Sequence, residues 1–143
     1  MKKIGLLGVL LFCGQMSFAQ AWQGSGDQKL QVGFSGYGNG TGLTATYDYG
    51  ISNILSLGAG VNFYTKGYKD DQKTFLFGRV NAHLQEPLSL SSKWDIYPGL
   101  DVGILGNTFD LGAHIGVRYF FTNNIGAFIE AGNNGSIGVT FNF

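Results

Sequence analysis

The sequence predicts an all-β fold, an eight-stranded antiparallel up-and-down barrel with a polar interior. Eight segments alternate apolar and polar residues with a period of two, the pattern of strands whose two faces differ. The chain has 24 glycines, two prolines, 15% aromatic and only 13% charged residues, a composition that suits closely packed strands and argues against disorder. The last segment, GSIGVTFNF, keeps its alternation up to Phe143, so the chain end is expected to be built into the sheet.

Residues 1–19 are predicted to be a secretory signal peptide. Lys2 and Lys3 form a basic start, a short apolar run follows, and a small-residue cleavage site ends at Ala19. The apolar run is too short to cross a bilayer as a helix. Residues 20–143 are therefore expected to form the barrel as a single domain.

The first four strands follow from the phase of their apolar residues. In order, the apolar sets are Leu30, Val32 and Phe34; Leu43, Ala45, Tyr47 and Tyr49; Leu55, Leu57, Ala59, Val61 and Phe63; and Leu76, Val80, Ala82 and Leu84. The members of each set lie an even number of residues apart, so each set is expected to cover one face of one strand.

The last four strands follow in the same way. Their apolar sets are Trp94, Ile96, Leu100, Val102 and Ile104; Leu111, Ala113, Ile115, Val117, Tyr119 and Phe121; Ile125, Ala127, Ile129 and Ala131; and Ile137, Val139, Phe141 and Phe143. Pro98 falls on the apolar face of the fifth strand, where it is expected to cost a ladder hydrogen bond unless a bulge relieves it.

The opposite face of these strands is polar, and this contrast predicts where the barrel resides. It holds Gln31, Thr44, Thr46, Asp48, Ser56, Asn62, Arg79, Asn81, His83, Asp95, Asp101, His114, Arg118, Glu130, Thr140 and Asn142. A polar inside and an apolar outside are typical of transmembrane barrels. Closed barrels and helices are the structures that satisfy every backbone group in lipid.

An even number of strands predicts that both chain ends lie on the periplasmic side. The connections after the first, third, fifth and seventh strands then face outward, and the charged TKGYKDDQK would be the main exposed loop. Aromatic residues at the strand ends are expected to form two interfacial girdles. The predicted periplasmic girdle comprises Tyr47, Tyr49, Trp94, Tyr119, Phe121, Phe141 and Phe143, and the predicted outer girdle comprises Phe34, Tyr37 and Phe63.

The stretches GVRYFFTNNIGAFIEAG and GSIGVTFNF resemble the last hairpins of small eight-stranded bacterial outer-membrane barrels of the OmpA/OmpX-like type, and YDYGISNILSLGAG is similar to their early hairpin. The start of the mature chain also looks like that of an uncharacterised subgroup. The resemblance implies an outer-membrane location, outer-membrane lipid as a partner, and contact with the barrel-assembly machinery through Phe141 and Phe143.

The candidate site is a polar network in the barrel lumen, formed by Arg79, Asp101, His114, Arg118 and Glu130. The turns suggest that Asp101 lies opposite His114, that Arg118 lies opposite or diagonal to Glu130, and that Arg79 reaches Asp101. An eight-stranded barrel is just wide enough for side chains to fill, and buried charges must be paired. The network is therefore expected to be a structural plug.

Other kinds of site have little support. His83 and His114 are expected roughly 10–15 Å apart along the barrel axis, too far to share a metal ion, and no cofactor is expected. The strand that carries His114 has no serine beside it, and no motif supports Ser56 or Ser136 as nucleophiles. A formal net charge of zero with no basic patch argues against nucleic acid.

The expected function is therefore non-enzymatic. We expect a monomeric outer-membrane barrel that acts as an envelope scaffold or displays surface loops. One alternative is a narrow channel for ions or small solutes. Another is a secreted soluble barrel with a ligand cavity, which requires the apolar sets to point inward. A lipid-modifying enzyme is a further alternative.

Overall fold

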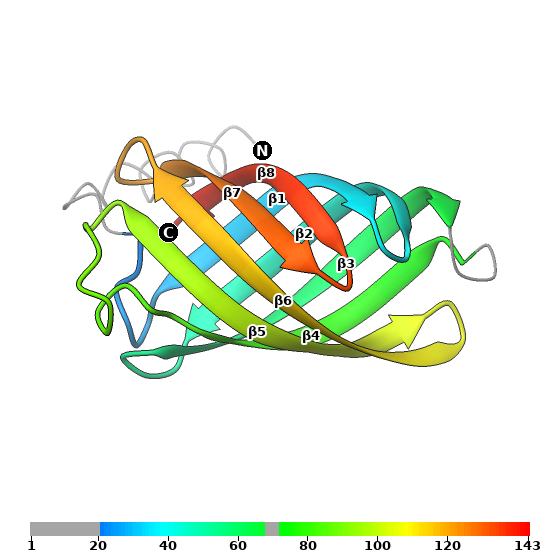
Figure 1. The fold of residues 1–143 in the computed structure, drawn as a ribbon, viewed down its shortest axis with the longest axis horizontal. Coiled ribbons are helices and arrows are strands. Elements are labelled where there is room, and N and C mark those ends of the chain that lie inside the picture. Colours follow the sequence, from blue (N-terminus) through cyan, green and yellow to red (C-terminus); the bar gives the residue numbers. More distant parts are fainter. Residues whose placement is uncertain (1–20, 68–71) are drawn as a thin grey trace, which may run out of the picture.

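The computed structural model describes residues 21–67 and 72–143, and within these ranges the chain forms one closed antiparallel barrel of eight strands (Figure 1). The strands are β1 (Gln28–Tyr37), β2 (Gly40–Gly50), β3 (Leu55–Gly67), β4 (Thr74–Ala82), β5 (Trp94–Leu105), β6 (Thr108–Phe120), β7 (Ile125–Gly132) and β8 (Gly135–Asn142). The all-β class and the number of strands are confirmed. The predicted signal peptide and residues 68–71 of the predicted outer loop lie outside the described residues. The described ranges contain no helix long and apolar enough to cross a membrane.

Each strand pairs with its neighbour in sequence, and β8 returns to pair with β1. The closing register places Val32 opposite Val139 and Lys29 opposite Asn142. This pairing accounts for the alternation at the chain end, because Ile137 and Val139 face outward while the flanking polar residues face the interior. Closure leaves none of the eight strands with a free edge.

The C-terminus lies at the same end of the barrel as the β2–β3, β4–β5 and β6–β7 connections (Figure 1). At the opposite end, β1–β2, β5–β6 and β7–β8 are joined by two-residue turns at 38–39, 106–107 and 133–134. Gly38 and Gly106 adopt positive φ angles of 100° and 62°, which glycine tolerates without strain. The outward connections expected after the first, fifth and seventh strands are therefore only two residues long. Among the fully described connections the longest is 83–93, at the end that carries the C-terminus.

The prediction that the apolar face of the strands points outward and the polar face inward is confirmed. Leu57, Val102, Ile115 and Val139 have exposed fractions of 51%, 46%, 52% and 42%, whereas Arg118 is fully buried. The interior also holds apolar side chains that the polar pattern did not predict. One cluster of four, Tyr64, Phe75, Phe77 and Leu105, is buried near the strand ends on the side of the two-residue turns.

Three predicted strand positions are corrected. Leu84 and Phe121 lie just beyond β4 and β6, since those strands end at Ala82 and Phe120. Phe143 likewise lies just beyond β8, which ends at Asn142. The ladder between β4 and β5 is interrupted at Pro98: its last pair is Asn81–Gly99, and past Pro98 the Leu84 N–H donates to the Ile96 carbonyl in the same register. Pro98 therefore interrupts the ladder as expected, and the β4–β5 register shows no bulge that relieves it.

Candidate functional site: a charged network inside the barrel

Arg118 from β6 is the first centre of the network inside the barrel and is fully buried. Its Nη2 donates to Asp48 Oδ2 at 2.6 Å, its Nη1 to Asp95 Oδ2 at 2.9 Å, and its Nε to Gln31 Oε1 at 2.5 Å. The guanidinium carbon lies 3.9 Å from the ring centroid of Tyr97, a cation–π contact. All these partners project inward because they share the polar phase of β1, β2 and β5.

Arg79 from β4 forms the second centre. Its Nε and Nη2 donate to the two carboxylate oxygens of Asp48 at 2.8 and 2.5 Å, a bidentate pair. Its Nη1 donates to Glu130 at 2.8 and 3.1 Å. Asp48 therefore bridges the two guanidinium groups. Both arginines are buried, so these pairs compensate a desolvation cost of several kcal/mol per ion.

Glu130 connects the network to Tyr97 and to β1. The Tyr97 hydroxyl donates to Glu130 Oε2 at 2.7 Å, and Gln31 Nε2 donates to the same oxygen at 3.0 Å. Gly116 makes room for the tyrosine, because a Cβ at this position would lie 2.2 Å from Tyr97 Cζ. The ring lies between the two arginines and Glu130, and all three of these partners contact it or its hydroxyl.

His114 lies toward the end with the two-residue turns, next to a small cavity. Its Nδ1 lies 2.9 Å from Asp101 Oδ2, and its Nε2 lies 2.7 Å from Asn81 Oδ1. Glu130, Asp101 and His114 line a cavity of about 20 Å³, enough for a single water molecule. The side chains leave little free volume at this level.

His83 lies just past β4, toward the end that carries the C-terminus. Its Nδ1 lies 2.9 Å from Asp95 Oδ2, and its Nε2 lies 2.8 Å from Ser56 Oγ. The order serine, histidine, carboxylate is that of a nucleophilic triad. All three residues are fully buried, and the Trp22 ring is stacked on His83 at 3.6 Å. In this arrangement no substrate reaches the serine.

The segment before β1 closes this end of the barrel. Trp22 Nε1 donates to the backbone carbonyl of Asn53 at 2.6 Å, and the Ala21 N–H donates to the Ser92 carbonyl at 2.6 Å. Lys29 is fully buried and forms an ion pair with Asp27. The Lys29 ammonium also lies over the rings of Trp22 and Phe120, at 5.7 and 5.5 Å from their centroids.

The structure places all five predicted site residues in the interior but pairs them differently from the prediction. Asp101 faces Gly112 across the ladder, not His114, which it reaches diagonally. Arg79 does face Asp101, yet its guanidinium binds Asp48 and Glu130. Arg118 faces Phe128 and is diagonal to Glu130, and its hydrogen bonds go to other strands.

The sequence prediction left several members of the network out. Asp48, Asp95 and Gln31 share the polar phase and were on the predicted inner face, but contacts across the lumen cannot be ranked from strand order. Tyr97 shares the phase of Asp95, but its aromatic side chain does not mark it as a member of a polar network. Trp22 precedes β1, where no periodic signal exists. Within the described ranges no group of three or more histidine, cysteine, aspartate or glutamate residues is arranged to hold a metal ion.

Comparison with known proteins supports the fold and places the chain in a family. No curated protein matches it. A solved structure described as "De novo design of transmembrane beta-barrels" shares 20% sequence identity with a TM-score of 0.70, covering 85% of this chain and 99% of that chain. This likeness shows the fold, and the relation to OmpA/OmpX-like barrels stays a prediction. Residues 12–136 match the sequence model of DUF6646, a family of unknown function, and the chain therefore belongs to that family.

Proposed function

We propose that this protein is a monomeric transmembrane barrel of the bacterial outer membrane that serves as a non-enzymatic envelope scaffold displaying short loops. One observation carries the proposal: the barrel is apolar outside and charged inside. Exposed apolar surface on this scale is unfavourable in water, whereas in a bilayer it is matched by the lipid chains. The charges that water would hydrate are instead paired with one another in the lumen.

The dimensions and the rims of the barrel support a membrane location. A tilted spanning strand needs about 9–11 residues, and the strands here have 8 to 13. Exposed aromatic side chains lie near both ends of the strands, with Tyr49, Trp94 and Phe143 at one end and Phe34 and Phe63 at the other. Aromatic girdles of this kind anchor barrels at the two interfaces.

The end that carries the C-terminus is assigned to the periplasm and the two-residue turns to the outer surface. This orientation follows from the predicted signal peptide, residues 1–19, and from the predicted reading of Phe141 and Phe143 by the barrel-assembly machinery. Phe143 suits that role because its side chain is exposed while its N–H donates to the Gln28 carbonyl across the β1–β8 seam.

A filled lumen supports a scaffold over a channel or an enzyme. Arg79, Arg118 and Tyr97 lie in the interior of the barrel and are fixed by carboxylates from three strands, β2, β5 and β7. Ser56, the one serine bonded to a histidine in the described residues, is fully buried. The soluble alternative requires an inward apolar face, and these apolar residues face outward.

The proposal is tested by expressing the full chain in a Gram-negative host and fractionating the cells. We expect the protein in the outer-membrane fraction, with faster migration on an unboiled gel than after boiling. In planar bilayers the purified barrel is expected to give no steady single-channel conductance. A folded protein that stays soluble without detergent would contradict the membrane location, and a conductance that R79A or R118A alters would favour the channel.

A further inference from the structure

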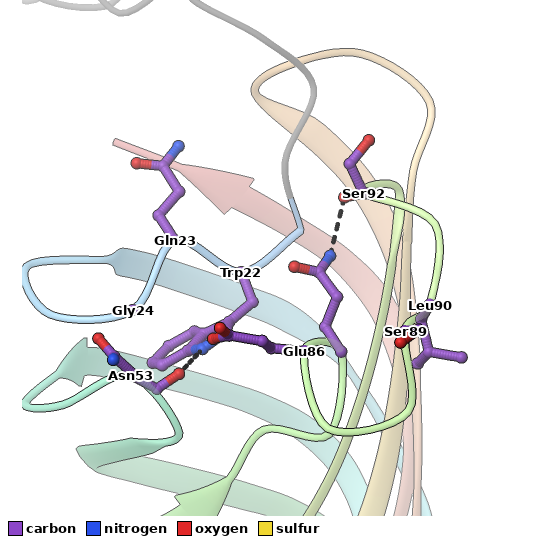
Figure 2. Close-up of a pocket in the computed structure, with 9 residues that line it drawn as sticks. Trp22, Gln23, Gly24, Asn53, Glu86, Ser89, Leu90 and Ser92 are labelled. Atoms are coloured by element: carbon purple, nitrogen blue, oxygen red, sulfur yellow. Dashed lines mark hydrogen bonds between the residues drawn. The ribbon is translucent and has the colours of Figure 1, made fainter.

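A cavity of about 510 Å³ opens at the end of the barrel that carries the C-terminus (Figure 2). Its walls come from the segment before β1, the β2–β3 turn and the β4–β5 connection. Cavities of roughly 300–1,000 Å³ are the usual size of small-ligand sites. The lumen network lies beneath the floor of this cavity, with Trp22 between the two.

The walls are held in place by hydrogen bonds before any ligand arrives. Trp22 is fixed by its stack on His83 and by its bond to the Asn53 carbonyl, and Figure 2 shows the latter bond. The buried Gln85 amide donates to three backbone carbonyls, of Ser91, Ser92 and Trp94, and so shapes the 83–93 connection from within. A site that is already ordered loses less entropy on binding.

Ser89 adds a local sign of constraint. It lines the cavity with a positive φ of 51°, a left-handed conformation that serine rarely adopts. Such conformations persist where the surrounding structure imposes them, and they concentrate at ligand sites. Here the imposing contacts are the turn bonds from the Ser89 N–H to the Glu86 carbonyl and from the Leu90 N–H to the Gln85 carbonyl.

Among the described residues the lining is polar and carries no positive charge. It offers the amides of Gln23 and Asn53, the hydroxyls of Ser89 and Ser92, and one carboxylate, Glu86. Within the described ranges no lysine, arginine or histidine lines it, so this lining has no group to pair with a phosphate or a carboxylate ligand. These side chains both donate and accept hydrogen bonds, which matches a neutral ligand rich in hydroxyl groups.

Two other ligand classes fit less well. An extended peptide is bound most often by adding a strand to a sheet edge, and the closed barrel leaves none of its strands an edge to offer. A lipid chain needs an apolar wall, and Leu90 and the edge of Trp22 are the apolar surfaces in this lining. The chemistry therefore favours a saccharide.

We propose that this cavity binds an uncharged saccharide segment, with Asn53 and Glu86 as the main hydrogen-bonding groups and Trp22 as a fixed wall. Its place in the cell rests on the proposed function, which orients this end toward the periplasm. Binding there would attach the scaffold to a glycan of the envelope.

The test uses the folded W94F protein, in which Trp22 is the single tryptophan, in an amine-oxide detergent that has no sugar head group. It is titrated with a tetramer of N-acetylglucosamine and with maltotetraose, up to about 10 mM, a range that covers millimolar affinities. Binding is followed by Trp22 emission and by calorimetry. We expect saturable binding of one or both sugars.

Matched variants decide whether binding occurs in this cavity. N53A and E86A are each expected to weaken binding about tenfold, the loss of one well-made hydrogen bond. N107A makes the same change as N53A in the turn at the opposite end and is expected to leave binding unchanged. Absence of binding to both sugars, or binding that N53A and E86A leave intact, overturns the proposal.

A tetrapeptide of similar size serves as the competing ligand. If it binds and the sugars do not, the cavity belongs to a peptide and the saccharide assignment is wrong. None of these outcomes affects membrane fractionation or heat-modified migration, so failure of this proposal and failure of the proposed function can be told apart.

Discussion

At the scale of single residues, Asp48 determines how the lumen is held together, because both guanidinium groups donate to it. Removing one partner from a buried ionic network leaves uncompensated charge, which costs more than the net value of the pair itself. The arrangement therefore predicts strong effects from small chemical changes inside the barrel.

D48N is expected to lower the free energy of unfolding by about 3–5 kcal/mol, because the amide cannot neutralise two buried cations. Urea unfolding in lipid vesicles, followed by tryptophan emission, measures this change. E86Q makes the same kind of change at an exposed position and is expected to stay within about 0.5 kcal/mol of the wild type. A D48N loss below about 1 kcal/mol would show that Asp48 is not the shared partner of the arginines.

The burial of His83 under Trp22 predicts that the segment carrying Trp22 comes away from the barrel as the pH falls. Burial lowers the pKa of His83 below its ordinary value of about 6.5, against the opposing effect of Asp95. Because the unfolded segment binds a proton more readily than the folded one, the contribution of His83 is complete above about pH 6.5 and is lost as the pH falls below it. In the W94F protein, Trp22 emission is expected to change on acidification below that pH.

The control for this titration is W94F combined with H83Q, which removes the titrating ring. Its Trp22 emission is expected to be flat over the same pH range. A transition that persists in the double variant would assign the pH response to another group, such as the neighbouring Asp95.

At the scale of elements, glycines in β5 and β6 allow the interior side chains to cross the narrow lumen. A Cβ at Gly99 would lie 2.3 Å from Asn81 Oδ1, and one at Gly116 would lie 2.2 Å from Tyr97 Cζ. Both distances are shorter than any real contact, so a side chain at these positions must displace its neighbour. The high glycine content of the strands thus reflects the polar filling of the barrel as well as its turns.

G116A is expected to destabilise the barrel by about 1–3 kcal/mol, because Tyr97 must move away from Arg118 and Glu130. G36A in β1 is the matched control, since a Cβ at Gly36 meets no atom within 4 Å. Both are measured by the same urea unfolding in vesicles. Equal stabilities would contradict the packing described for Tyr97.

Phe143, which follows β8, is expected to matter for assembly of the barrel in cells but little for the stability of the folded barrel. F143A is expected to reduce the amount of barrel assembled in cells, because the predicted signal for the assembly machinery is lost. Refolded from urea, the same variant is expected to stay within about 1 kcal/mol of the wild type, since the backbone bond to Gln28 remains. F109A, an exposed phenylalanine near the β5–β6 turn, is the control and is expected to assemble normally.

At the scale of the whole molecule, the barrel reverses the usual arrangement of a soluble protein, with its charges inside and its aliphatic surface outside. The described strands form a complete cylinder, so every strand has two partners and no edge is open to aggregation. This arrangement is stable where the solvent is lipid, and that condition can be tested at one outward position.

I115R is expected to cost about 2–4 kcal/mol in a bilayer, because Ile115 lies near the middle of β6 and faces outward. I125R places the same charge at the first residue of β7, near the predicted interface, where the cost is expected to fall to about 0–1 kcal/mol. Unfolding in vesicles measures both. Equal costs would argue that the two positions share the same surroundings and would weaken the membrane assignment.

The sequence by itself determined the class of the fold, the number of strands and the direction of their faces. These follow from a period-two pattern, which is local, because each residue indicates which face of its own strand it occupies. Closure of the barrel follows from the need to pair every strand edge. Leu57 and Arg118 could thus be assigned to outside and inside without coordinates.

Only the tertiary structure decided which polar groups meet. Asp48 binds arginines from β4 and β6, and Glu130 accepts from Tyr97, which reaches over Gly116 of the strand between them. These contacts depend on strand register, barrel width and side-chain length together, and a strand pattern specifies none of the three. The docking of Trp22 on His83 was likewise beyond sequence reasoning, because it joins an irregular segment to a connection between strands and neither has a periodic signal.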